Sequence, residues 1–107
     1  AQNFRRYTSN AVGTSPATLV TANSYDTIVG ISVSNIVGST ILADVYINDG
    51  SNDIYLVKSA PIPSGGSLQI LAGGAKFVMQ ASDVLKVKSD TASSADVWVS
   101  AVDDIST

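Results

Sequence analysis

Apolar and polar residues alternate along one short segment after another between Ile28 and Val102. A β-strand places successive side chains on opposite faces, so this alternation is typical of antiparallel strands with one buried face. No segment repeats its apolar residues at the helical period of about 3.6 residues. The aliphatic residues of common parity, which we expect to face the core, are Val29, Ile31 and Val33; Ile41, Ala43, Val45 and Ile47; Ile54 and Leu56; Leu68 and Ile70; Leu85 and Val87; and Val97, Val99 and Ala101.

Turn-forming residues divide these segments into separate strands. Asp49-Gly50 is a strong hairpin signal because both residues tolerate a positive φ, and the prolines within residues 61–66 interrupt any sheet ladder. The predicted strands cover residues 17–21, 26–36, 40–48, 53–60, 66–71, 75–80, 83–89 and 95–103. About seven to nine short strands at this spacing predict an all-β fold, a single antiparallel β-sandwich of jelly-roll type, with a small barrel as the alternative.

Residues 1–16 differ from the rest of the chain. They carry both of its arginines and end in the loose connection Gly13-Thr14-Ser15-Pro16. We interpret them as an N-terminal arm or edge strand that precedes a β-sandwich domain over residues 17–107. Aromatic rings and fork-shaped guanidinium groups suit a contact with another protein. The candidate partner-binding residues of the arm are therefore Phe4, Arg5, Arg6 and Tyr7.

The composition argues against catalysis. The 107 residues fit one domain and include no histidine and no cysteine. The chain therefore cannot build a Ser-His-Asp or Cys-His nucleophile, or a zinc site with nitrogen or sulfur ligands. Asp49, Ser51 and Asp53 have the alternate spacing of a calcium loop but lack the rest of that pattern, so we interpret them as a turn. We expect no catalytic residues, no metal and no cofactor.

The charge balance and hydropathy limit the kinds of partner. Nine aspartates against six basic residues give a net charge of −3. We expect no nucleic-acid partner, because binding phosphates requires clustered lysine and arginine. No segment approaches the roughly 20 consecutive apolar residues of a transmembrane helix, so we expect no membrane span.

Three aromatic residues have the parity opposite to the aliphatic core positions. Tyr46 and Tyr55 flank the Asp49-Gly50 hairpin and can meet on its outward face, and Trp98 lies between two inward-facing valines. One interpretation is a partly exposed aromatic patch that binds a protein or a sugar. The other is that both faces of the sandwich are partly covered, for example within an oligomer. The sequence leaves both interpretations open.

Two long runs carry a recognisable pattern. They read TIVGISVSNIVGSTILADVYINDGSNDIYLVKSAPIPSGGSLQIL and KFVMQASDVLKVKSDTASSADVWVSAVDDI. The pattern consists of a strand that ends in Ser-Asn, a D-V-Y-I strand, a Y-L-V-K…P-I-P-x-G-G-S-L segment, the run D-V-L-K-V-K-S and a final strand. With this pattern, the chain resembles small virion structural proteins of tailed bacteriophages, particularly of marine and cyanobacterial hosts, from Phe4 to Ile105.

The resemblance implies a non-enzymatic component of a virion that is assembled in the cytoplasm of the bacterial host. The leading hypothesis is a capsid decoration (cement) protein that binds the major capsid protein and stabilises the head. The alternatives are a component of the tail, baseplate or fibre that binds a tail protein, and a carbohydrate-binding β-sandwich module that uses Tyr46, Tyr55 and Trp98. From the outward aromatic residues we expect a homo-oligomer, with a trimer favoured over a dimer.

Overall fold

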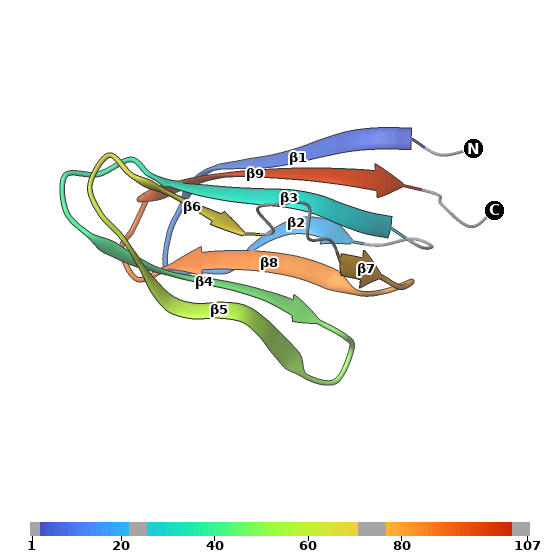
Figure 1. Cartoon of the computed structure of the whole chain (residues 1–107). Coiled ribbons are helices and arrows are strands. Elements are labelled where there is room, and N and C mark those ends of the chain that lie inside the picture. The colour runs from blue at the N-terminus through green and yellow to red at the C-terminus, as the bar shows by residue number, and fades with distance from the viewer. Residues whose placement is uncertain (1–2, 22–25, 71–76, 104–107) are drawn as a thin grey trace.

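The chain folds into nine β-strands without a helix in the part that the structure describes (Figure 1). The structure is a computed structural model, and it describes residues 3–21, 26–70 and 77–103. The strands are β1 (Asn3–Val12), β2 (Ala17–Thr21), β3 (Asp26–Asn35), β4 (Ile41–Asn48), β5 (Asp53–Ile62), β6 (Ser67–Ile70), β7 (Phe77–Met79), β8 (Val84–Ser89) and β9 (Ala95–Asp103). All eight strands predicted after residue 16 are present, so the all-β prediction is confirmed.

The strands form two antiparallel sheets that pack face to face. Sheet A has the order β1-β9-β3-β6, with β7 also paired to β3, and sheet B has the order β2-β8-β4-β5. The pairs β4–β5, β3–β6, β2–β8 and β1–β9 are nested inside one another along the chain. The chain is therefore one long hairpin that rolls up into two sheets, which is the jelly-roll arrangement. The predicted β-sandwich is confirmed.

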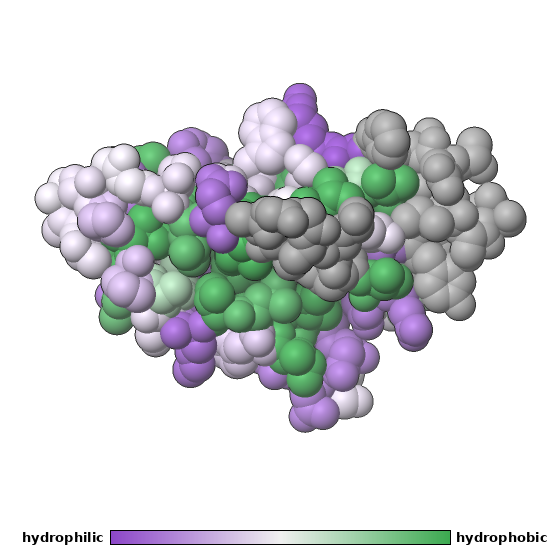
Figure 2. Space-filling view, in the orientation of Figure 1, coloured by the Kyte–Doolittle hydropathy of each residue, from purple (hydrophilic) through white to green (hydrophobic). Residues whose placement is uncertain are grey.

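The core lies between the two sheets and consists of the inward-facing residues of both. The buried hydrophobic residues are Val12, Leu19, Val20, Ile28, Ile31, Val33, Ile41, Ala43, Val45, Ile62, Met79, Leu85, Val87, Ala95, Val97, Val99 and Ala101. At the open side of the sandwich, between β5 and β6, Figure 2 shows apolar surface in the middle of the molecule. Leu56, Leu68 and Ile70, on these two edge strands, are only partly buried against the core.

Two residues of the expected core are exposed to solvent. The register of β3 against β9 steps from Ile28↔Ala101 to Gly30↔Ser100, which leaves Val29 as an extra residue in a β-bulge. Val29 is consequently 37% exposed, whereas Ile28 is fully buried. Ile54 is 54% exposed because it lies near the start of edge strand β5, where only β4 flanks it. The inward orientation expected for Val29 was wrong. Ile54 shares the inward face of its register partner Ile47, as expected, but none of the described residues covers it at the sheet edge.

An N-terminal arm and an edge strand were the two forms expected for residues 1–16, and β1 is an edge strand of sheet A. β1 pairs with β9 from Asn3↔Asp103 to Val12↔Ala95, with a register shift between Ser9 and Val12. Val12 is 3% exposed and belongs to the core. The boundary after residue 16, between an arm and a separate domain, remains a prediction.

The predicted Asp49-Gly50 hairpin is confirmed as the β4–β5 turn. Gly50 has a φ of +98°, a conformation that glycine adopts without steric cost. Asp49 N–H donates to the Asn52 carbonyl at 3.1 Å, and Asp49 Oδ1 accepts from the N–H groups of Ser51 at 3.0 Å and Asn52 at 2.8 Å. The carboxylate of Asp49 thus serves the turn itself.

Candidate functional site

The predicted partner-binding residues fall on opposite sides of the sandwich. Trp98 and Arg6 lie on the outer side of sheet A, and we call their surroundings the Trp98 face; its polar residues are Arg6, Thr8, Asn10, Ser32, Ser34, Asp96 and Ser100. Tyr46 and Tyr55 lie on the outer side of sheet B, and we call this surface the Tyr55 face; its members are Asp44, Tyr46, Tyr55, Lys58, Lys86 and Lys88. The three aromatic residues therefore do not form one patch.

The Trp98 ring is held on two sides by its own sheet. Trp98 is centrally placed on β9, where its register partners are Thr8 on β1 and Ser32 on β3. The Arg6 guanidinium carbon lies 5.5 Å from the ring centroid, a cation–π contact. The indole Nε1–H donates to Ser100 Oγ at 3.3 Å. With 50% of the residue still exposed, the ring combines a fixed position with a free surface.

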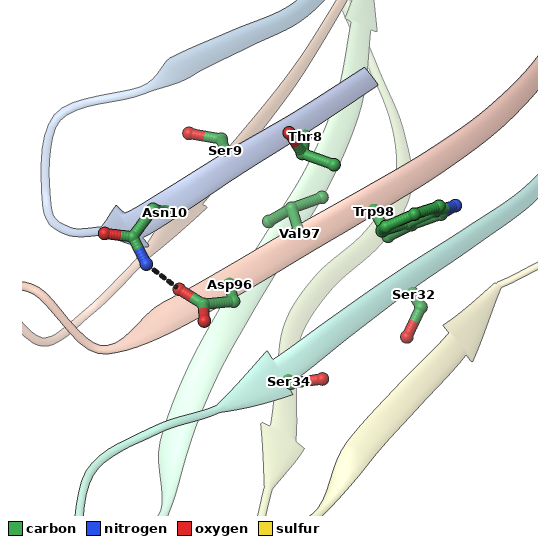
Figure 3. A pocket seen from close by; sticks show the side chains of 8 residues that line it. All are labelled: Thr8, Ser9, Asn10, Ser32, Ser34, Asp96, Val97 and Trp98. Atoms are coloured by element: carbon green, nitrogen blue, oxygen red, sulfur yellow. Dashed lines mark hydrogen bonds between the residues drawn. The ribbon is translucent and has the colours of Figure 1, made fainter. Parts of the chain in front are cut away.

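A shallow hollow of about 340 Å³ adjoins this ring (Figure 3). It is lined by residues of β1, β9 and β3, and all of them except Val97 and Trp98 have polar side chains; Asn10 and Asp96 lie at one end and Trp98 at the other. Asp96 Oδ1 accepts from Asn10 Nδ2 and from the Ala11 N–H, both at 2.9 Å. These two bonds fix the carboxylate in place beside the hollow.

The sequence identified Trp98 but missed the polar residues around it. Ser32 and Ser34 alternate with buried residues of β3, as Asp96 and Trp98 do on β9, so their outward orientation was readable from parity. Their proximity to one another was not predictable, because β3 and β9 lie at least sixty residues apart in the chain and meet only through the order of strands in the sheet.

On the Tyr55 face, the expected meeting of Tyr46 and Tyr55 is confirmed. They are register partners on β4 and β5, with ring centroids 4.9 Å apart and an interplanar angle of 37°. Lys58 Nζ lies 4.4 Å from the centroid of the Tyr55 ring. Tyr46 is only 5% exposed although it faces outward, since Tyr55 and Lys86 flank it on the neighbouring strands.

The hydroxyl of Tyr46 is harder to ionise than that of a free tyrosine. Burial raises the pKa of the Tyr46 hydroxyl above its usual 10.0, and the negative charges of Asp53 and Asp44 act in the same direction. Asp44 is 8% exposed; its Oδ1 accepts from the Ser59 N–H at 2.7 Å, and its Oδ2 lies 3.9 Å from Lys88 Nζ. The face therefore pairs aromatic rings with lysine side chains.

The other candidates of residues 1–16 contribute differently. Arg5 and Arg6 are both exposed on β1. Tyr7 is partly buried and packs against the core, so it belongs to the sandwich as well. The backbone of Phe4 pairs with Val102, and its side chain lies outside the described part of the structure.

Among the residues that the structure describes, no group of three or more histidine, cysteine or acidic side chains could hold a metal ion. The same residues include no helix that is long and apolar enough to cross a membrane.

No protein-family model matches the chain, and no curated protein matches its sequence. The solved structures that share its fold include the following two. A protein of Bacillus endospore appendages, which form a novel family of disulfide-linked pili, superposes with a TM-score of 0.58 at 11% identity, over 95% of this chain and 84% of that one. A pentameric capsid protein isolated from metagenomic phage sequences superposes with a TM-score of 0.50 at 17% identity, over 94% of this chain.

The likeness at these identities concerns the fold. The chain spans 60% of the length of the phage capsid protein. The pilus protein belongs to a disulfide-linked assembly, whereas this chain has no cysteine. One of these proteins comes from a pilus and the other from a capsid.

Proposed function

We propose that this chain is a non-enzymatic structural subunit of a bacteriophage virion, and within the virion a decoration (cement) protein on the capsid. One observation carries the proposal. The segments that resemble virion proteins of tailed phages are the strands and turns that build the jelly roll, the fold shared with a pentameric capsid protein from phage sequences. Viral capsid domains are frequent users of this architecture.

The Tyr55 face is the proposed contact with the major capsid protein. Lys58, Lys86 and Lys88 gather there on a chain whose net charge is −3. This local positive charge suits a partner surface that carries carboxylates. Tyr55 is 39% exposed and supplies an aromatic ring of the kind enriched at protein interfaces.

Edge strand β1 is the second proposed contact, with a neighbouring protein chain. An edge strand presents unpaired backbone groups to which a neighbouring chain can add a strand. The exposed Arg5 and Arg6 would pair with carboxylates of that neighbour. Phe4 and Tyr7 complete the residues expected at this contact. Copies of the chain would associate as a homotrimer, or next as a homodimer, and join the virion in the cytoplasm of the bacterial host.

The location of the protein on the particle tests this function. Antibodies against the chain, with gold labels, would be applied to purified virions of the phage that encodes it. We expect label over the surface of the heads. Label confined to tails, baseplates or fibres would favour the alternative role of a component there, and particles without label would contradict any structural role in the virion.

The proposed capsid contact has its own test. Heads that lack the protein would be mixed with the purified chain and sedimented. We expect the wild-type chain to co-sediment, and Lys58→Ala with Lys86→Ala to bind less, with a difference that shrinks as salt rises, because charge pairing near a surface is screened. Val78→Ser, an exposed position on sheet A, is the matched control and should bind like the wild type.

A further inference from the structure

We propose that the hollow beside Trp98 is a binding site for a neutral saccharide. The proposal concerns the Trp98 face, on the other sheet from the proposed capsid contact, and stands independently of the virion assignment. Three properties of this hollow support the proposal. The Trp98 side chain is exposed and fixed in position, the side chains around the hollow can form hydrogen bonds, and the Asp96 carboxylate lies at the end opposite Trp98.

The aromatic ring offers a platform for the apolar face of a sugar. Trp98 is 50% exposed, and its position is fixed by Arg6 and by the bond from Nε1–H to Ser100. A sugar ring presents C–H groups on one side, which pack on an indole through dispersion and weak C–H contacts to its π-system. The fixed ring loses little freedom when a ligand binds.

The Tyr55 face offers less free ring surface. Tyr46 is almost fully buried, and Tyr55 is 39% exposed against 50% for Trp98. A cation lies over both exposed rings, but Lys58 Nζ lies closer to the Tyr55 centroid, at 4.4 Å, than the Arg6 guanidinium carbon does to the Trp98 centroid, at 5.5 Å. The sequence alone treated Tyr46, Tyr55 and Trp98 as equivalent candidates for a sugar site. The structure assigns this role to Trp98.

The polar residues around the hollow match the hydroxyl groups of a sugar. Asp96 Oδ1 is held by Asn10 and the Ala11 N–H, while Asp96 Oδ2 accepts no hydrogen bond from the described residues. A carboxylate oxygen in this position can accept from a sugar hydroxyl in a charge-assisted bond. The hydroxyls of Thr8 and Ser34, which also line the hollow, can both donate and accept.

The charge and size of the hollow narrow the class of saccharide. A volume of about 340 Å³ lies at the lower end of the range for small-molecule sites, so a few sugar units can contact it. The Asp96 carboxylate at its end, on a chain of net charge −3, disfavours an acidic sugar. The ligand is therefore a neutral hexose or N-acetylhexosamine oligomer.

Trp98 also makes the proposal testable, because it is the only tryptophan of the chain and reports on this site alone. The full chain would be titrated with hexamers of glucose, mannose or N-acetylglucosamine up to about 10 mM, a range that detects weak binding. We expect a saturable change in tryptophan emission with at least one of these three hexamers. A sialylated oligosaccharide should produce a weaker change or none.

Calorimetry would measure the variants, since Trp98→Ala removes the reporter. We expect Trp98→Ala to weaken binding about tenfold or more and Trp98→Phe to keep part of it. Ser34→Ala and Asp96→Asn should weaken it less. Tyr55→Ala, on the opposite face, is the matched control and should bind like the wild type. Circular dichroism would establish that each variant is folded.

Three results would overturn the proposal. One is that none of the three hexamers changes the emission or releases heat. Another is that folded Trp98→Ala binds the sugar as tightly as the wild type. A third is that the tryptophan emission changes only with protein concentration and that Trp98→Ala abolishes self-association. A second copy of the chain would then cover the Trp98 face. Particle labelling reads out the virion role separately, so either proposal can fail alone.

Discussion

At the scale of single residues, Tyr46 couples the Tyr55 face to the stability of the fold. Its pKa is raised by burial and by nearby carboxylates, while in the unfolded chain it stays near 10. Below about pH 10 both states keep the proton. Above it the unfolded state loses the proton first, so the free energy of unfolding falls as the pH rises until the folded-state pKa is passed.

Tyr46→Phe should therefore make the stability less dependent on alkaline pH. Phenylalanine keeps the ring that packs 4.9 Å from Tyr55 but has no proton to lose. Urea unfolding between about pH 8 and pH 11 would measure the free energy of unfolding of both proteins. If the free energy of unfolding falls equally steeply with pH in the two proteins, Tyr46 is not linked to alkaline stability.

Asp90 acts at the opposite end of the pH scale. Its Oδ1 accepts hydrogen bonds from the Leu42 N–H and the Thr91 hydroxyl, both at 3.0 Å, and these bonds hold the pKa of the carboxyl below 3.8. Both states are ionised above about pH 4, and on acidification the unfolded state takes up the proton first. Stability is thus lost as the pH falls through the lowered pKa. In Asp90→Asn, the free energy of unfolding measured with urea should fall less steeply as the pH is lowered. An unchanged dependence on pH would contradict this assignment.

At the scale of the elements, the β4–β5 turn depends on a backbone conformation that only glycine adopts readily. Gly50 has a φ of +98°, so Gly50→Ala should lower the free energy of unfolding by about 1 kcal/mol through backbone strain. Gly38, in another turn, has no such φ and no atom within 4 Å of an added Cβ. Gly38→Ala should change stability by less than about 0.5 kcal/mol. Equal losses for the two variants would contradict the argument.

The edge strand β1 can be tested by deletion. Removing residues 1–16 takes Val12 out of the core, together with the partly buried Tyr7 and the pairing with β9. We expect Tm to fall by about 10 °C or more, because these losses amount to several kcal/mol. Arg5→Ala with Arg6→Ala should leave Tm nearly unchanged. A truncated chain that melts like the full chain would show that residues 1–16 are an arm separable from the sandwich.

The elements also show how far sequence reasoning reaches. The strands and the Asp49-Gly50 hairpin were predictable because alternation and turn chemistry are local properties. Val29 was placed on the wrong face because a one-residue bulge, next to Gly30, reverses the parity of the strand. The hollow beside Trp98 was not predictable either, since Asp96, Ser34 and Thr8 meet only through the order of strands in sheet A.

At the scale of the whole molecule, the sandwich leaves apolar surface at the edge of sheet B. On β5, Ile54 is 54% exposed and Leu56 is only partly buried against the core. Adjoining apolar side chains of this kind on an edge strand favour contact with another chain. This edge is accordingly where we expect copies of the chain to meet.

Light scattering after size-exclusion chromatography would test this contact. At micromolar concentration we expect a particle of three times the chain mass of 11.0 kDa, with a dimer as the next possibility. Ile54→Ser should shift the population to the monomer, because the change removes exposed apolar surface without touching a buried residue. Val78→Ser alters a side chain that is 63% exposed on β7 of sheet A and should leave the oligomer intact. A wild-type chain that remains a monomer over this concentration range would contradict the prediction. An oligomer that survives Ile54→Ser would place the contact elsewhere, with edge strand β1 as the next candidate.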